Sequence, residues 1–299
     1  MKPSFWKRLK KPRLLSRIWK HIRALFFVDQ WVILIANSAK RERTSLSWAD
    51  FKSILPPTDR IWADPFIWVH EGHNFIFIEE KLFSEPYGHI ICLALDDQMN
   101  VIFNQVVLER PYHLSYPFVF EHDDQLYMIP ETKDNHAIEL YKCQQFPNQW
   151  VFEKTLIGSV DAVDATLIEK QGKWWLFANI ETDGSSWDSL HLFYSDHPLS
   201  DKWTSHPQNP IVKDVHKARP AGRITSRDGN LIRPSQDCSA RYGYATNFNR
   251  ITILTETDYA ETCEWTFKPP KKGNILATHT WNEANGIIAI DAVMRNRKF

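Results

Sequence analysis

Carboxylates stand at matching points of several apolar segments in this 299-residue chain. Asp64 and Asp164 each open such a segment, and Glu131 closes one. A carboxyl group in a suitable environment acts as a general acid, a general base or a nucleophile, so we expect these three residues to be catalytic. Other polar residues occupy matching positions or the loops that lead into them. Those that we expect to bind a substrate are Glu79, Arg110, His113, Tyr116, Arg219, Arg223, Arg233, Gln236, Asp237 and His279.

A turn-capping role is the alternative for any single acid of this set. An aspartate at the start of a strand often accepts hydrogen bonds from neighbouring backbone amides. Convergence of several acids is harder to explain in this way, because like charges held together cost energy unless a sugar, a metal or an arginine compensates them. The acids expected to converge are Asp64, Glu79, Glu131, Asp164 and Asp237. As a set they indicate function.

A sequence repeat positions these residues. Its copies begin at Asp64, Tyr116, Asp164, Ala221 and Thr278, between 48 and 57 residues apart. Each copy starts with a small or polar pair, continues through strand-forming residues, and reaches a Gly or Asp eight positions on. A second apolar run follows each turn, a pattern typical of a β-hairpin. Further strands are predicted over 90–95, 101–108, 138–143, 151–157 and 190–195.

Five such units in a row predict an all-β fold, a five-bladed β-propeller over residues 28–299. A β-sandwich is the alternative, and the regular spacing favours the propeller. Because the fifth copy lies near the C-terminus, a strand over 31–36 is expected to complete its sheet and close the ring. In a propeller the first strand of each blade lines the axis, and its start lies at the same rim as the end of the second strand. The register therefore predicts a polar funnel at that rim.

The charges are segregated along the chain, although 36 basic and 36 acidic residues give a formal net charge of zero. Residues 1–26 contain nine basic residues and no acid, so the remainder carries 27 − 36 = −9. Apolar residues recur there at helical spacing and predict a basic amphipathic helix over residues 1–27. We expect residues 1–26 to bind an anionic membrane surface. Docking on the acidic body or on a partner protein is the alternative.

Several classes of site are disfavoured by what the sequence lacks. No apolar stretch reaches the ~20 residues of a membrane span, and the four cysteines have no close spacing typical of a zinc site or disulfide framework. We therefore expect a cytoplasmic protein held at the inner face of the cell membrane. No glycine-rich phosphate loop occurs, and His70 and His73 flank a turn at the opposite rim, so we expect no cofactor and no metal. The confinement of basic charge to one end argues against nucleic acid as a partner.

A group of short phrases runs through the predicted propeller. They are Ala63–Phe66, Glu109–Phe118, Met128–Glu131, Asp164–Thr166, Ala218–Gly222, Arg233–Cys238 and Tyr242–Gly243. Together they resemble the N-terminal domain of the glucosamine inositolphosphorylceramide transferase family, in the free-standing form of bacterial proteins. The resemblance implies a role in cell-surface polysaccharide or glycolipid biosynthesis. It implies a sugar, nucleotide-sugar or glycolipid substrate, and glycan-assembly enzymes as partners.

More distantly, the body resembles the five-bladed glycoside hydrolases of the arabinanase and β-xylosidase type. In those enzymes blade one supplies an aspartate base, blade three an orienting aspartate, and blade four a glutamate acid. Asp64 and Asp164 match the first two, but blade four opens with Arg219-Pro-Ala-Gly222 and has no acid there. Because hydrolysis needs a protonated acid at the leaving oxygen, ordinary hydrolysis is in doubt unless Glu131 or Asp237 substitutes.

An arginine at the blade-four position favours an anionic group, such as the phosphate of an activated sugar. We therefore prefer glycosyl transfer, with Asp64 or Asp164 as the base toward an acceptor hydroxyl. The arginines expected near the anion are Arg219, Arg223 and Arg233. Hydrolysis and non-catalytic carbohydrate binding remain the alternatives.

Overall fold

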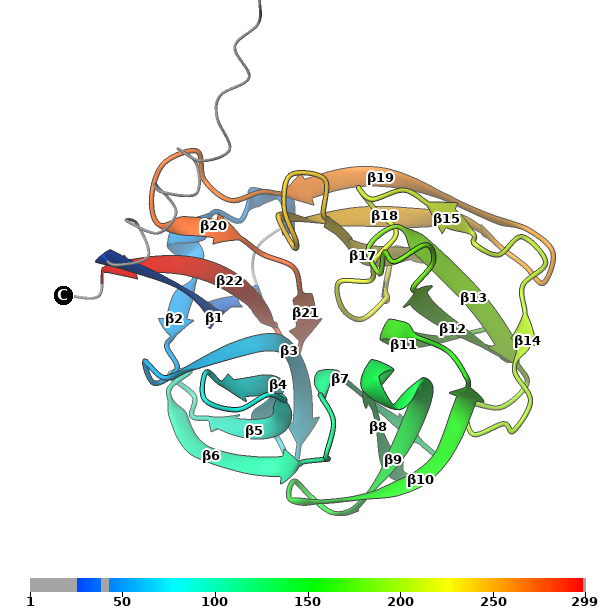
Figure 1. The fold of residues 1–299 in the computed structure, drawn as a ribbon, viewed down its shortest axis with the longest axis horizontal. Coiled ribbons are helices and arrows are strands. Elements are labelled where there is room, and N and C mark those ends of the chain that lie inside the picture. The colour runs from blue at the N-terminus through cyan, green and yellow to red at the C-terminus, as the bar shows by residue number, and fades with distance from the viewer. Residues whose placement is uncertain (1–25, 39–42, 298–299) are drawn as a thin grey trace, which may run out of the picture.

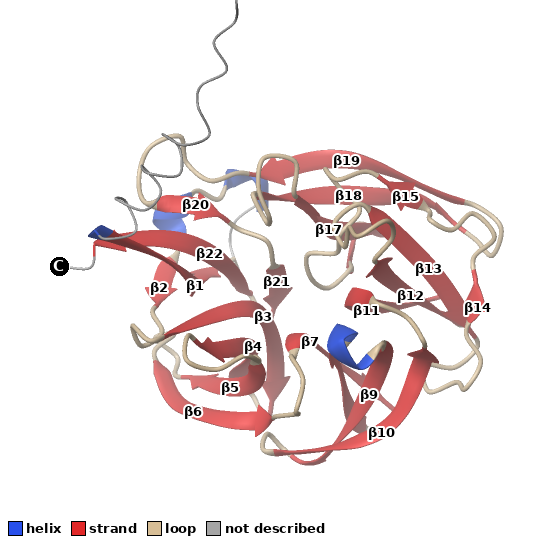
Figure 2. Cartoon of the chain, viewed as in Figure 1, coloured by secondary structure: helices blue, strands red, loops and turns tan. Residues whose placement is uncertain are grey.

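The computed structural model describes residues 26–38 and 43–297. Five antiparallel sheets surround a central axis, with β3, β7, β11 and β21 innermost (Figure 1). Strands make up nearly all of the regular structure, and the helices are short (Figure 2). The predicted five-bladed β-propeller is confirmed. The expected helix over 1–27 lies outside the described residues, apart from its last two.

Blades one and two follow the predicted plan of four strands in chain order. Blade one contains β3 (Arg60–His70), β4 (His73–Leu82), β5 (His89–Leu95) and β6 (Val101–Leu108). Blade two contains β7 (Ser115–His122), β8 (Gln125–Glu131), β9 (Ala137–Gln145) and β10 (Gln149–Gly158). The predicted strands over 90–95, 101–108, 138–143 and 151–157 are all present within one or two residues.

Blades three and four depart from this plan at their edges. Blade three contains β11 (Ala162–Lys170), β12 (Lys173–Ile180) and β13 (Ser189–Ser195), with the short β14 (Thr204–Ser205) and β15 (Val212–Lys213) pairing with β13. Blade four contains β16 (Thr225–Arg227), β17 (Asn230–Asp237), β18 (Ala245–Leu254) and β19 (Tyr259–Phe267). A first strand starting at Ala221 is therefore wrong, since only 225–227 pairs continuously with β17 and the segment before it makes a single bridge.

The fifth blade joins the two ends of the chain. Strand β22 (Ile287–Arg297) pairs along its whole length with β1 (Phe27–Asn37), so the predicted closing strand is confirmed and longer than expected. On its other side β22 pairs with β20 (Ile275–Ala277) and β21 (Trp281–Ala284), and β2 (Lys52–Ile54) completes the edge beyond β1. Residues Thr278–Thr280 interrupt the strand that lines the axis in this blade.

In three of the blades, the residue at which the repeat begins has a positive φ, in the left-handed region of the backbone map. Asp64 (φ 52°), Tyr116 (φ 44°) and Asp164 (φ 56°) lie at β-bulges, where the pairing with the second strand skips. Such backbone conformations are uncommon for residues other than glycine and cost of order 1–3 kcal/mol each. A bulge also re-aims a side chain. The sequence repeat therefore reflects one backbone feature, which directs these side chains to the axis.

The core lies between neighbouring sheets. The seam between blades four and five, for example, is filled by Phe248, Phe267 and Trp281. The ring centroid of Trp281 lies 5.1 Å from that of Phe248 and 5.2 Å from that of Phe267. Gly222 permits the close approach of blade four to blade five, because a Cβ added there would lie 2.1 Å from the carbonyl oxygen of Trp281. None of the helices in the described part of the chain is long and apolar enough to cross a membrane.

Candidate active site

One end of the propeller axis gathers the polar residues of the repeat. We call it the mouth, defined as the end at which the chain enters each first strand. The ends of the second strands lie beside these starts, since Ala63 pairs with Glu79, Ser115 with Glu131, and Val163 with Asn179. The register argument from the sequence therefore places these side chains in one region of the structure.

Asp164 is held by donors from blade four. Arg219 donates from Nε to Oδ2 of Asp164 at 2.5 Å and from Nη2 to Oδ1 at 3.3 Å, and Gln236 donates to Oδ2 at 2.9 Å. All three residues are buried. Paired donors of this kind fix the orientation of a carboxylate. Asp164 is thus a rigid part of the site.

Glu131 lies next to this pair and is a different kind of acid. Its Oε2 lies 3.5 Å from Nη2 of Arg219 and accepts no hydrogen bond from the described residues. Burial, together with the negative charge of Asp164, holds the pKa of Glu131 well above its ordinary value, although Arg219 acts in the opposite direction. The environment of Glu131 thus favours its protonated form, the form that can act as a general acid.

Asp64 forms a second group with residues of blade five. Thr280 donates its hydroxyl to Oδ1 of Asp64 at 2.6 Å, and Nε2 of His279 lies 3.6 Å from the same oxygen. Burial raises the pKa of Asp64 to about 6, while the positive charge of His279 limits the rise. Asp64 is thus mostly ionised at neutral pH, and its pKa lies close enough to that pH for the carboxylate to accept a proton.

His279 owes its charge to a third carboxylate, Asp291. Nδ1 of His279 lies 2.5 Å from Oδ2 of Asp291, and the backbone amides of His279 and Thr280 both donate to Oδ1. Burial alone would lower the pKa of His279, but Asp291 and Asp64 raise it to about 9. The imidazole also stacks on Trp31, with ring centroids 4.2 Å apart. His279 is therefore a fixed cation beside Asp64.

These side chains also have the spacing of a metal site. The ligating atoms of Asp64, His279 and Asp291 all lie within 4.8 Å of one another. Without an ion, the two carboxylates favour the protonated form of the imidazole, which donates hydrogen bonds from both ring nitrogens. The arrangement as it stands is a network of ion pairs.

Glu79 and His113 extend the cluster toward blade one. Gly88 donates its backbone N–H to Nδ1 of His113 at 2.8 Å, so the neutral ring carries its proton on Nε2, which lies 3.4 Å from Oε1 of Glu79. Burial and the charge of Asp64 raise the pKa of Glu79 to about 8. Gly88 is required at this point, because a Cβ there would lie within 2.9 Å of both side chains.

Tyr116 fills the axis beneath these groups. Its hydroxyl accepts the backbone N–H of Gly222 at 2.7 Å and lies 2.9 Å from Oγ1 of Thr166, and the residue is fully buried. It joins blades two, three and four. The structure therefore gives it a structural role and leaves no part of it exposed to a substrate.

Four of the expected binding residues lie away from the cluster. Arg223 donates to the carbonyl of Val119, past the bulge in β7, and so points toward the other end of the axis. Asp237 accepts the backbone N–H and the hydroxyl of Ser239, which makes it a turn cap. The other two are Arg110 and Arg233.

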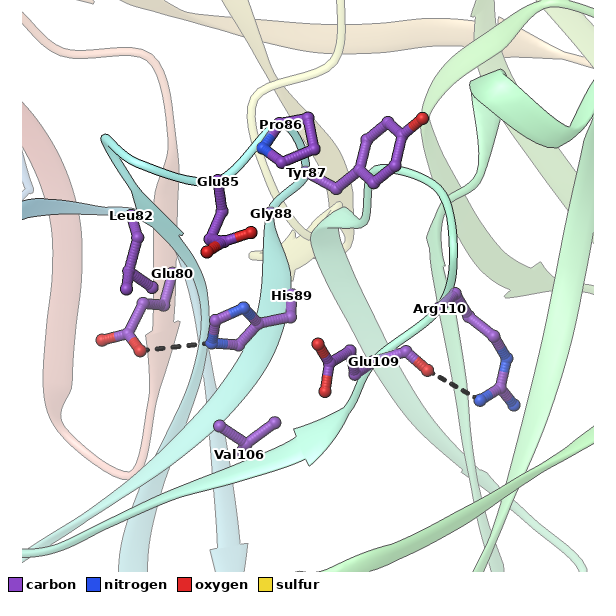
Figure 3. Close-up of a pocket in the computed structure, with 10 residues that line it drawn as sticks. All are labelled: Glu80, Leu82, Glu85, Pro86, Tyr87, Gly88, His89, Val106, Glu109 and Arg110. Carbon is purple, nitrogen blue, oxygen red and sulfur yellow. Dashed lines mark hydrogen bonds and ion pairs between the residues drawn. The ribbon is translucent and has the colours of Figure 1, made fainter.

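Arg110 lines a pocket on the rim of blade one. Figure 3 shows its guanidinium bonded to the carbonyl of Glu109, and Nε also donates to the hydroxyl of Tyr141 at 3.2 Å. The pocket has a volume of about 430 Å³. Glu80 and His89 contact each other at 3.2 Å in its wall (Figure 3). Glu80 follows Glu79 in β4, so the pocket adjoins the cluster on its outer side.

Arg233 is buried inside blade four and forms a paired ion bridge with Glu261. Its Nε and Nη2 donate to the two carboxylate oxygens at 2.8 and 2.7 Å, and Nη2 also donates to the carbonyl of Lys217. These partners occupy the guanidinium. The expected position near a substrate anion is therefore corrected to a structural one.

Replacing Arg233 by lysine tests this correction. Lysine keeps the charge but loses the paired geometry, so we expect the free energy of unfolding in urea to fall by about 1.5–3 kcal/mol, the scale of a charged hydrogen bond. We expect the affinity for an activated sugar to be unchanged. An unchanged stability with a weakened affinity would return Arg233 to the binding site.

Sequence reasoning missed Asp291, Thr280 and Trp31. Asp291 is the centre of the blade-five group, and it stands alone in the apolar run Ile287–Val293. An isolated acid within a buried strand is rare unless it is paired. The isolated acid was therefore the sequence signal that could have identified Asp291 as a paired residue. The pairing of Asp164 with Arg219 had no such signal, because 55 residues separate them.

Comparison with known proteins finds relatives of this chain in sequence and in fold. Residues 46–290 match the family model described as "Glucosamine inositolphosphorylceramide transferase 1, N-terminal". A protein of that name from Oryza sativa subsp. japonica is 37% identical over 208 residues, which are 67% of this chain and 27% of the relative. The Arabidopsis thaliana protein of that name is 30% identical over 226 residues, 74% of this chain and 29% of the relative. The chain thus spans less than a third of the length of these plant relatives.

Solved structures with the same fold include glycoside hydrolases. Zg3597, a family 117 glycoside hydrolase from Zobellia galactanivorans, aligns with a TM-score of 0.57 and 11% identity over 90% of this chain and 91% of its own. The Bombyx mori GH32 beta-fructofuranosidase BmSUC1 aligns with a TM-score of 0.58 and 10% identity over 95% of this chain and 65% of its own. At this identity the likeness shows the fold alone.

Proposed function

The chain belongs to the family of the N-terminal region of glucosamine inositolphosphorylceramide transferase 1, and from this premise we propose that it transfers a sugar from an activated, phosphate-bearing donor to a glycolipid acceptor. The observation that carries the proposal is the contrast between two carboxyl groups at the mouth. The pKa of Asp64 rises only to about 6, because the positive charge of His279 limits the effect of burial, whereas burial and Asp164 hold the pKa of Glu131 well above its ordinary value. Two carboxyl groups with separated pKa values are the usual signature of a base and an acid acting together.

In the proposed reaction Asp64 accepts the proton of the acceptor hydroxyl as its oxygen bonds to the anomeric carbon of the donor. The bond from that carbon to the donor phosphate oxygen breaks, and the departing oxygen receives the proton of Glu131. The supporting geometry is that both groups lie at the ends of paired strands around one axis. Asp164 is proposed to orient the sugar, because its position is fixed by Arg219 and Gln236.

Of the three arginines expected near the phosphate, only Arg219 supports that role. It lies at the mouth, but Asp164 and Glu131 already neutralise it. Stabilisation of the leaving group is therefore proposed to come chiefly from proton donation by Glu131, in place of a cluster of free cations.

The position of the protein in the cell is part of the proposal. We place it at the inner face of the cell membrane, bound through the nine basic residues of 1–26, in cell-surface polysaccharide or glycolipid biosynthesis. The plant relatives are named glucosamine inositolphosphorylceramide transferase 1, and this name supports a glycolipid substrate. A bacterial origin and glycan-assembly enzymes as partners stay predictions.

An acceptor-dependence assay tests the proposed reaction. The full chain is incubated with a panel of nucleotide sugars, with and without a glycolipid extract, and both sugar release and glycolipid mass are followed. We expect mass gains on the lipid that depend on the acceptor. Release of free sugar at the same rate without acceptor supports hydrolysis, the second candidate, which the same acid and base would serve. Binding without turnover of any donor would leave a carbohydrate-binding propeller and contradict the proposal.

A further inference from the structure

A basic edge runs along the mouth side of blades four and five. Its members lie in the loop before β18, in the loop between β19 and β20, and at the end of β22. They are Arg241, Lys268, Lys271, Lys272 and Arg297. All five are exposed, and none has an ion-pair partner among the described residues. An edge of this length without a compensating acid attracts an anionic surface.

Exposed aromatic residues continue this edge onto its neighbours. Phe26, just before β1 in blade five, is 55% exposed, and Phe83 and Tyr87, in the loop after β4 in blade one, are 55% and 43% exposed. Figure 3 shows Tyr87 on that loop, at the border of the pocket. Exposed aromatic rings beside cations are typical of surfaces that contact a lipid headgroup region.

The opposite end of the propeller has a different character. Its hairpin turns expose acids, among them Glu71, Asp123 and Asp228. Its exposed large apolar residues near those turns are aliphatic, such as Ile102 and Ile253. These acids disfavour contact between the hairpin turns that carry them and an anionic surface.

The basic N-terminal segment joins the chain at the mouth. Phe27 pairs with Arg297, at the end of β22, so residues 1–26 are attached to the rim that carries the basic edge. The nine basic residues of this segment have the same sign of charge as the basic edge.

We infer that the propeller docks on an anionic lipid bilayer with its mouth face, through blades four, five and one. In this orientation the end of the axis at which Asp64 and Glu131 lie faces the lipid surface. A glycolipid headgroup then reaches the site without leaving the bilayer. The inference rests on the proposed function for its substrate, but the docking face is independent of the chemistry.

Vesicle sedimentation with paired charge reversals tests the docking face. The full chain is mixed with vesicles of phosphatidylcholine alone, or of phosphatidylcholine with phosphatidylglycerol. The test variant is Lys271→Glu/Lys272→Glu at the mouth, and the matched control is Lys170→Glu/Lys202→Glu near the opposite end. Each cation near an anionic bilayer strengthens partitioning roughly five-fold, so we expect the mouth variant to lose at least about tenfold and the control to lose much less.

A second variant separates lipid from other polyanions. Phe83→Ser/Tyr87→Ser is expected to weaken vesicle binding several-fold without changing binding to inorganic polyphosphate, because a lipid headgroup region accepts aromatic rings and polyphosphate offers them no apolar contact. Equal losses from the mouth and control reversals would overturn the docking face. Tighter binding of the unmodified chain to polyphosphate than to anionic vesicles would also overturn it.

Transfer to a detergent-dispersed acceptor is measured in parallel. It should persist in Lys271→Glu/Lys272→Glu, because none of these residues touches the site. Absence of transfer in the unmodified chain would count against the proposed function alone, and the sedimentation result would still decide the docking face.

Discussion

Replacing Asp64 by asparagine is expected to lower the rate of sugar transfer by about 10²- to 10⁴-fold, the usual range for loss of a general base. Asparagine tolerates the left-handed backbone at this bulge, and its amide oxygen can still accept the hydroxyl of Thr280. The fold should therefore persist while the base is lost. We expect the loss in kcat, with a smaller change in KM, since the proton moves in the transition state.

A matched control comes from the other end of the axis. Asp123 is also left-handed (φ 50°), in the turn between β7 and β8. Asp123→Asn makes the same chemical change at an exposed turn and should leave the rate within about twofold, as surface substitutions usually do. Full activity in Asp64→Asn, with normal folding by circular dichroism, would contradict its role as the base.

The blades were predictable because their signals are local. Turn residues such as Gly72, Asp124 and Gly172 punctuate apolar runs at a fixed interval, and each such run forms a hairpin in the structure. The interval also located the bulges of blades one to three, since a residue that tolerates left-handed backbone recurs at the same place. The predicted start of the first strand in blade four was wrong. Gly222 lies there against the backbone of Trp281, and that contact is made with another blade.

The candidate site was predictable in its position and much less so in its electrostatics. Strand register alone brought Asp64, Glu131 and Asp164 to one rim. Which of them keeps a proton depends on pairings made across the axis, such as that of Asp164 with Arg219, and on burial. Neither quantity can be read from spacing.

The partners of the arginines could not be predicted from the sequence either. A guanidinium near a predicted rim is equally compatible with a substrate anion and with an internal carboxylate. Glu261, which pairs with Arg233, comes from the fourth strand of the same blade, and Val119, which binds Arg223, comes from another blade. Only the packing of sheets decides between these partners.

Replacing Glu131 by glutamine is expected to slow transfer by about 10²- to 10⁴-fold and to change only the alkaline side of the pH profile. In the unmodified protein the rate should fall as the pH drops through about 6, where Asp64 becomes protonated, and should fall again as the pH rises through the elevated pKa of Glu131. The glutamine variant cannot lose a proton. It should keep the acid limb and lose the alkaline limb.

The leaving group gives an independent check of the role of Glu131. A donor whose leaving group departs easily as an anion needs little proton donation, so the deficit of Glu131→Gln should shrink with such a donor. Glu181→Gln is the control, because Glu181 lies at the same rim in a surface ion pair with Lys133. An alkaline limb that survives in Glu131→Gln would assign the acid to another group. Glu79, whose pKa is raised to about 8 beside Asp64, would then be the next carboxyl group to test.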